Sequence, residues 1–191
     1  MKPVTRQELL DLGGYEQVRE HFRRRVIAEK QARYVALGGN MTALFENRDT
    51  VLFQIQEMLR TERITAEKAI LHELETYNEL VPGDHELSAS IFIEYPDRDE
   101  RERMLVALAG VDDKFYLLAG GDRCTVVPDP RSTEAGRTIA VHFVKFPLSP
   151  AAEKAVREGR SALKLGVAHP AYSAEVELSA GTLQSLAADF E

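Results

Sequence analysis

The feature that most constrains the fold is a change in the spacing of apolar residues near Leu87. Before this point, apolar residues recur at helical spacing; after it, they alternate with polar residues over short runs, as in half-buried strands. The pattern predicts an α+β protein with a helical N-terminal part that contains a β-hairpin, residues 1–86, and a sheet-rich part, residues 87–191. One continuous domain that includes both parts is the alternative.

The chain is expected to open with a short helix followed by a long one. Thr5 and Glu8 have the spacing of a capping box, and Gly13-Gly14 is expected to end the short helix. The long helix should cover residues 15–33. Its expected apolar face consists of Tyr15, Val18, Phe22 and Val26.

A β-hairpin and two further helices are expected next. Two apolar runs, residues 33–37 and 41–45, are joined by Gly38-Gly39-Asn40, residue types that tolerate the positive φ of a tight turn. Asn47 is a good N-cap for the helix that follows, and another helix should begin near Thr65.

The second part contains the order strand, proline stop, helix, strand, strand twice. The first unit opens with a strand at residues 88–95 that Pro96 ends, and the second with a strand at residues 138–146 that Pro147 ends. This predicts a mostly antiparallel sheet with helices, and a duplicated unit would place those helices on one face. A degenerate duplicated β-α-β-β unit explains the order, and so does coincidence, because such orders are common. The intervening residues 128–136 are expected to form a surface loop.

Composition restricts the classes of partner that the chain can bind and the cellular compartment in which it is expected. The formal net charge is −7, which argues against a nucleic-acid partner, because binding phosphates needs a concentrated basic face. Cys124 is the sole cysteine, so neither a disulfide within the chain nor a thiolate metal cage can form. No secretory signal and no apolar run near the roughly 20 residues of a membrane span are present. We therefore expect a cytoplasmic protein with no membrane partner.

Standard catalytic motifs are missing. The sequence has no P-loop, no glycine-rich dinucleotide-binding motif, no G-x-S-x-G and no H-E-x-x-H. None of the five histidines has a glutamate three residues before it, as di-iron helical bundles require. The sequence therefore leaves open whether this is an enzyme, and it indicates no particular cofactor.

A polar segment leads into the helix after the hairpin. Its members are Glu46, Asn47, Arg48, Asp49, Gln54, Glu57 and Arg60. One interpretation is structural: an N-cap, a carboxylate in the first turn and surface ion pairs. The other is that these side chains line a groove beside the hairpin and bind a ligand or a partner.

Histidines and carboxylates on separate elements support a second functional hypothesis, a metal site. The candidate ligands are Glu57, His72, Glu75, His142 and His169. A histidine with carboxylates can bind a divalent metal, but this site requires at least three of the five side chains to converge. Otherwise His72 and Glu75 lie on a solvated helix face, and His142 is a satisfied histidine at the edge of the core.

Four stretches resemble a known bacterial family. They are residues 45–60 (FENRDTVLFQIQEMLR), 73–83 (ELETYNELVPG), 144–146 (VKF) and 169–172 (HPAY). They resemble the family of domain of unknown function 3501, DUF3501, over nearly the whole chain.

The resemblance implies a bacterial cytoplasmic protein whose gene neighbours those of a rubrerythrin and an iron–sulfur oxidoreductase. It thereby implies a redox or peroxide-defence setting with these two proteins as partners, and it assigns no residue a role. Two hypotheses result: an accessory protein that binds a ligand or partner, or a metal-binding protein or metal-assisted enzyme.

Overall fold

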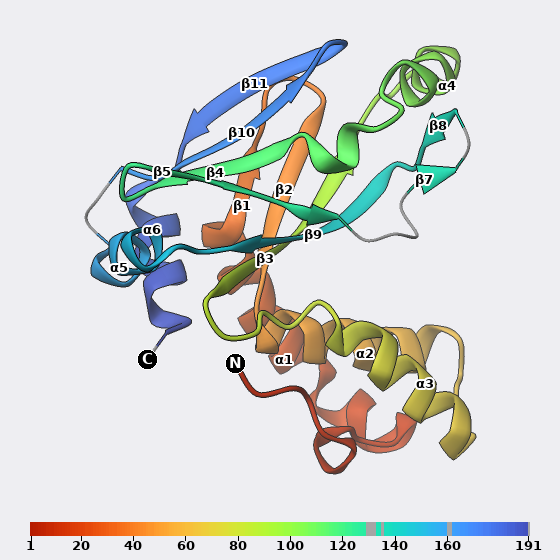
Figure 1. The fold of residues 1–191 in the computed structure, drawn as a ribbon. Helices are drawn as coiled ribbons and strands as arrows, with labels where there is room; N and C mark the ends of the chain where they lie inside the picture. The colour runs from red at the N-terminus through yellow and green to blue at the C-terminus, as the bar shows by residue number, and fades with distance from the viewer. Residues whose placement is uncertain (129–132, 135, 160–161, 191) are drawn as a thin grey trace.

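The computed structural model describes residues 1–128, 133–134, 136–159 and 162–190. The fold is α+β, as predicted from the sequence. Two antiparallel sheets lie over one another, and the N-terminal helices cover the outer side of the larger sheet (Figure 1). Both ends of the chain lie near the same corner of the molecule.

The first helices differ from expectation in two places. They are η1 (Arg6–Glu8), α1 (Leu12–Arg33), α2 (Arg48–Thr61) and α3 (Glu67–Asn78). Gly13 and Gly14 do not end a helix but belong to the first turn of α1, because the Asp11 side chain caps it by accepting from the Gly14 N–H at 2.7 Å. Val18 is 44% exposed. It lies about 60° around the helix from Tyr15 and so falls outside the buried stripe.

The larger sheet contains the predicted hairpin. Its strand order is β1 (Tyr34–Ala36), β2 (Met41–Glu46), β3 (Glu86–Ile93), β9 (Val141–Pro147) and β6 (Val127–Pro128). Tyr34 lies opposite Leu44 across the hairpin. Because β2 also pairs with β3, the hairpin from the first part and the strands of the second share one sheet.

The smaller sheet holds the remaining long strands. Its order is β11 (Tyr172–Glu177), β10 (Lys164–His169), β4 (Phe115–Ala119) and β5 (Asp122–Thr125). A separate pair is formed by β7 (Thr133–Glu134) and β8 (Arg137–Thr138). The loop expected over residues 128–136 therefore contains short strands where it is described, and residues 129–132 and 135 lie outside the described residues.

The repeated strand–helix–strand–strand order gives a symmetric pairing across two sheets. The first strands of the two units, β3 and β9, are antiparallel neighbours in the larger sheet. Their third elements, β4 and β10, are antiparallel neighbours in the smaller one, flanked by β5 and β11. This is the pairing that a duplicated unit would produce, divided between two antiparallel sheets instead of one. Duplication itself stays a prediction.

Helices of the second part lie at the edges of the two sheets. They are α4 (Arg98–Ala107), η2 (Val111–Asp113), α5 (Pro150–Glu158) and α6 (Ala180–Ala188). Figure 1 shows α4 at one end of the sheets and α5 and α6 at the other, whereas α1, α2 and α3 lie below the larger sheet. The one-faced arrangement of helices expected for a duplicated unit is therefore not seen, because two packed sheets leave open ends that helices close.

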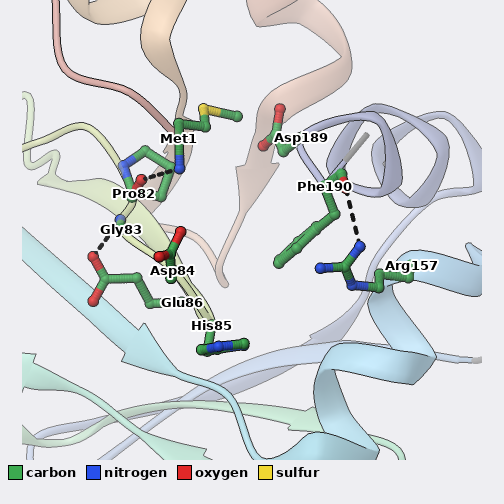
Figure 2. A pocket seen from close by; sticks show the side chains of 9 residues that line it. All are labelled: Met1, Pro82, Gly83, Asp84, His85, Glu86, Arg157, Asp189 and Phe190. Atoms are coloured by element: carbon green, nitrogen blue, oxygen red, sulfur yellow. Dashed lines mark hydrogen bonds between the residues drawn. The ribbon is translucent and has the colours of Figure 1, made fainter.

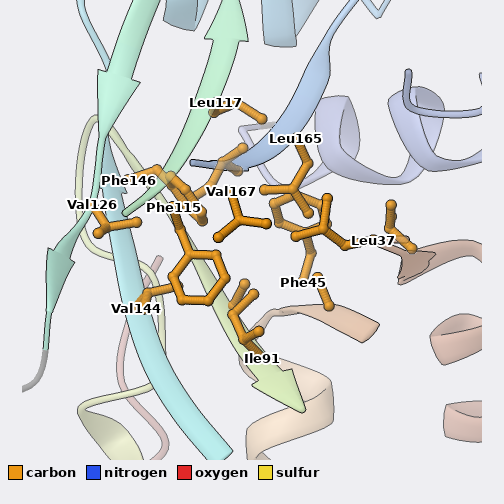
Figure 3. Close-up of a cluster of buried hydrophobic side chains, with 14 of the residues drawn as sticks. Leu37, Phe45, Ile91, Phe115, Leu117, Val126, Val144, Phe146, Leu165 and Val167 are labelled. Atoms are coloured by element: carbon orange, nitrogen blue, oxygen red, sulfur yellow. The ribbon is translucent and has the colours of Figure 1, made fainter. Parts of the chain in front are cut away.

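Strand alternation divides the interior into two cores. Ala89, Ile91 and Ile93 of β3 point between the sheets, into the core drawn in Figure 3. Ser88 and Ser90 point the other way, toward the helical layer, where they are also buried. The second core joins α2 and α3 to this outer face of the sheet, with Phe143 of β9 packed against it. The helical layer and the sheets are thus held together by continuous packing.

Over the described ranges, none of the helices combines the length and apolar character needed to cross a bilayer.

Candidate functional site

The start of the polar segment is buried beneath α2. Glu46, the last residue of β2, is 7% exposed. Its carboxylate accepts hydrogen bonds from Thr50 Oγ1 at 2.5 Å and from Ser90 Oγ at 2.6 Å. Two hydroxyl donors therefore satisfy this buried group, and Glu46 joins β2, β3 and α2 rather than facing a groove.

Arg33, at the end of α1, organises the residues next to Glu46. It is 1% exposed and donates to the backbone oxygens of Phe45 at 2.8 Å and Glu46 at 3.1 Å. It also donates to Ser185 Oγ at 3.0 Å and, through two nitrogens, to both carboxylate oxygens of Asp189. Because its donors are matched by acceptors from β2 and α6, this buried cation is satisfied.

Asp189 follows α6, and its ion pair with Arg33 holds this end of the chain beside the end of α1. Burial raises the pKa of its carboxyl above the usual value, and the hydrogen bonds from Arg33 oppose that rise. Beside it, the Asn47 side chain donates to Glu29 and accepts from the Thr50 N–H at 2.9 Å, which caps α2 as predicted.

These groups surround an open hollow with a volume of about 280 Å³, which we name the Asn47 hollow. It is lined by Met1, Glu29, Arg33, Asn47, Arg48, Asp49, Ser185, Ala188 and Asp189. Arg48 contacts Glu8 at 2.5 Å, and Asp49 contacts Arg25 at 3.0 Å. Three of the residues predicted from the polar segment thus line one hollow, whose other wall comes from α6.

The rest of the polar segment ties helices together. Glu57 accepts two hydrogen bonds from Arg19, at 2.7 and 2.8 Å, and one from Tyr15 at 2.7 Å. Arg19 holds the pKa of Glu57 below its usual range, whereas burial and the Glu57 contact raise the pKa of Tyr15. Arg60 pairs with Glu16 at 2.5 Å. These are contacts between α1 and α2, so the structural interpretation fits this end of the segment.

Gln54 is likewise placed away from the hollow. It is exposed on α2 and lies beside Tyr77 of α3.

The candidate metal ligands lie on separate elements. Within the described residues, no group of three or more His, Cys, Asp or Glu side chains is placed to hold a metal ion. His72 and Glu75 are exposed on α3, and Glu57 is paired with Arg19. The structure does not bring these three ligands together.

The other two histidines of that hypothesis have structural partners. His142 is fully buried, and its Nε2 lies 2.9 Å from Thr138 Oγ1. His169 accepts from the Ala171 N–H at 3.1 Å through Nδ1, a hydrogen bond within the turn between β10 and β11. Its Nε2 lies 3.2 Å from the Ala109 carbonyl oxygen.

A second hollow contains a residue that the sequence did not single out. It has a volume of about 370 Å³, and we name it the His85 hollow (Figure 2). It is lined by Met1, Pro82, Gly83, Asp84, His85, Glu86, Arg157, Asp189 and Phe190. His85 Nδ1 lies 2.5 Å from Glu153, which is 68 residues away in the chain. Pro82-Gly83 signals a turn there, but no spacing rule links His85 to a residue so distant.

Comparison with known proteins gives a family. The family model described as a protein of unknown function (DUF3501) matches residues 3–190. The chain belongs to this family. The resemblance seen in residues 45–60 is thereby confirmed. No curated protein matches the chain.

A solved structure is similar to this chain over nearly its whole length. A crystal structure of a protein of unknown function from Burkholderia pseudomallei is 34% identical and covers 98% of this chain and 99% of its own, with a TM-score of 0.91.

Proposed function

We propose that this member of the DUF3501 family is a cytoplasmic accessory protein that binds its partner or ligand at the Asn47 hollow. The observation that carries this proposal is the convergence of charged side chains from α1, α2 and α6 around one open hollow. Packing of these three helices does not by itself require charged side chains to meet there.

The charged side chains at the rim of the Asn47 hollow can exchange their present ion-pair partners for charges of a bound protein. Arg48 and Asp49 sit in ion pairs whose side chains are 29–54% exposed, and exposed pairs contribute only about 0–1 kcal/mol. A partner's charges can replace these contacts at little cost. The floor differs, because buried Arg33 and Asp189 hold each other in place. A rigid floor with exchangeable rim charges favours a defined binding geometry.

The partner in this proposal is a redox protein, either a rubrerythrin or an iron–sulfur oxidoreductase. Support comes from the family resemblance and from this chain's own residues. Cys124 is buried, and the part of the chain that the structure describes has no clustered metal ligands. We therefore assign the redox centre to the partner. The net charge of −7 supports a protein rather than a nucleic acid in this role.

Two matched arginines test the proposal. Arg48 and Arg60 lie at opposite ends of α2, and each pairs with one glutamate at 2.5 Å. Binding to each candidate redox protein is measured by titration calorimetry for the wild type, Arg48→Gln and Arg60→Gln. We expect Arg48→Gln to weaken binding about tenfold, because one charged hydrogen bond to the partner is lost. Arg60→Gln should leave the affinity unchanged. Equal effects of the two substitutions, or no binding by the wild type to either protein, would overturn the proposal.

A further inference from the structure

His85 has a backbone conformation that its residue type seldom adopts. Its φ is +59°, in the left-handed region, which costs a non-glycine residue on the order of 1 kcal/mol or more. The surrounding structure fixes it there, because the His85 carbonyl accepts from the Leu148 N–H at 2.8 Å. Strain of this kind clusters at active sites, ligand clamps and switch regions. Here the side chain is presented to the His85 hollow.

A single carboxylate orients two basic side chains at this hollow. Glu153, only 13% exposed, lies 2.5 Å from His85 Nδ1 and accepts from Arg157 Nε at 2.7 Å. His85 and Arg157 together hold the pKa of Glu153 below its usual value, so the carboxylate stays ionised. The ionised carboxylate accepts from Nδ1–H, and when the ring carries both protons Nε2–H is left to donate to a ligand.

Arg157 is held on its other side by the end of the chain. Its Nη1 donates to the Phe190 carbonyl at 3.0 Å, and its guanidinium lies 4.9 Å from the centre of the Phe190 ring. Figure 2 shows Arg157 and Phe190 on one wall of the hollow, His85 at its base, and Asp84 on the opposite wall. The Arg157 terminal nitrogen that does not contact Phe190 points toward the middle of the hollow.

Among the described lining residues, only one carboxylate lacks a counter-charge. Glu86 pairs with Lys145 at 2.6 Å, and Asp189 pairs with Arg33. Asp84 has neither an ion pair nor a hydrogen bond within the described ranges 1–128, 133–134, 136–159 and 162–190. Among the described residues, one wall of the hollow therefore presents the unpaired Asp84 carboxylate and the Met1 ammonium, which donates to the Pro82 carbonyl at 3.0 Å. The other wall presents an arginine with an imidazole.

We propose that the His85 hollow binds a small zwitterion of the amino-acid type. The ligand's carboxylate accepts from Arg157 and His85, its ammonium group donates to Asp84, and the Phe190 ring covers the carbon chain between them. A volume of about 370 Å³ suits a small molecule. An anion alone would meet the uncompensated charge of Asp84, and a cation alone would meet Arg157, so a ligand with both charges is favoured.

This inference goes beyond the binding of a redox partner at the Asn47 hollow. The hollows share Met1 and Asp189 in their linings, but the recognition groups differ. The experiments below therefore leave Arg48 and Asp49 untouched, so either proposal can fail without the other.

A homologous series of zwitterions tests the proposal and measures the separation of the two walls. The probes are glycine, β-alanine and 4-aminobutyrate, with butyrate and butylamine as carriers of one charge only. Binding is followed by calorimetry and by the imidazole NMR signals of His85. We expect one zwitterion to bind at least tenfold more tightly than butyrate or butylamine and to shift the His85 signals. Binding of butyrate as tight as that of every zwitterion, or no binding by any zwitterion, would overturn the proposal.

Three variants assign the two ends of the ligand. Asp84→Asn should lower affinity for the best zwitterion about tenfold and leave affinity for butyrate unreduced, because only the ammonium contact is lost. His85→Asn should also weaken binding, and asparagine tolerates the positive φ, so the backbone is retained. Lys154→Gln removes a charge from the exposed side of α5 and serves as the control. Thermal melts check that each variant is folded. An Asp84→Asn variant that binds the zwitterion like the wild type would contradict the assignment.

Discussion

Arg33 and Asp189 form a buried, two-pronged ion pair that joins the end of α1 to the end of α6 across 156 residues of sequence. Their side chains are 1% and 7% exposed. Because Arg33 also bonds the last residues of β2, the pair fixes three segments around the Asn47 hollow.

Removing one partner of this pair should destabilise the fold strongly. Arg33→Met leaves a buried carboxylate and two buried carbonyl groups without their donor, and breaking a buried pair in this way typically costs about 3–5 kcal/mol. Urea denaturation measures the change in the free energy of unfolding. Arg60→Gln, which breaks an exposed pair, is the control and should cost no more than about 1 kcal/mol. Similar losses in the two variants would refute the structural importance of the Arg33–Asp189 pair.

His142 should make the protein less stable in mild acid. Burial lowers its pKa from the usual value of 6.5, so the unfolded chain binds a proton at a pH where the folded protein does not. The stability contribution is therefore complete above pH 6.5 and is lost as the pH falls from there toward the lowered pKa of the folded state. Denaturation of the wild type and His142→Gln across this range compares the slopes. The wild type should lose stability more steeply, and equal slopes would contradict the burial of a neutral imidazole.

Adjacent glycines in the β1–β2 turn should respond differently to alanine. Gly38 has φ of +76°, and a Cβ there would come within 2.4 Å of the Tyr172 hydroxyl, which donates to the Leu37 carbonyl at 2.7 Å. A Cβ on Gly39 would meet nothing within 4 Å. Thermal melts should show that Gly38→Ala destabilises by at least about 1 kcal/mol and Gly39→Ala by less. The reverse order would mean that the turn is not held against β11 as described.

Sequence periodicity predicts most of the long helices and strands but not how they assemble. Asn47 signalled the start of α2 and Gly38-Gly39-Asn40 signalled the hairpin, because caps and turns depend on neighbouring residues. The division of the strands between two sheets depends on contacts between distant segments, which apolar alternation does not encode. The misplaced break at Gly13-Gly14 has a local cause, since Asp11 supplies a cap that glycine can follow.

The candidate site was anticipated only in part. Arg48 and Asp49 were recognised because polar residues clustered beyond what helix packing requires, and they do line a hollow. Glu57 looked equally suitable, but its role depends on Arg19, which lies 38 residues away on another helix. Arg33 and His85 were missed for the same reason, since their partners, Asp189 and Glu153, are far away in sequence.

The central claim, that this chain binds a partner where α1, α2 and α6 meet, is tested most directly by amide hydrogen exchange. Exchange is measured on the intact protein with and without each candidate redox protein. The account predicts added protection at the start of α2, residues 47–50, and at the end of α6, residues 185–189, with α3 and the smaller sheet unchanged. Protection confined to α3 or to the smaller sheet would contradict it.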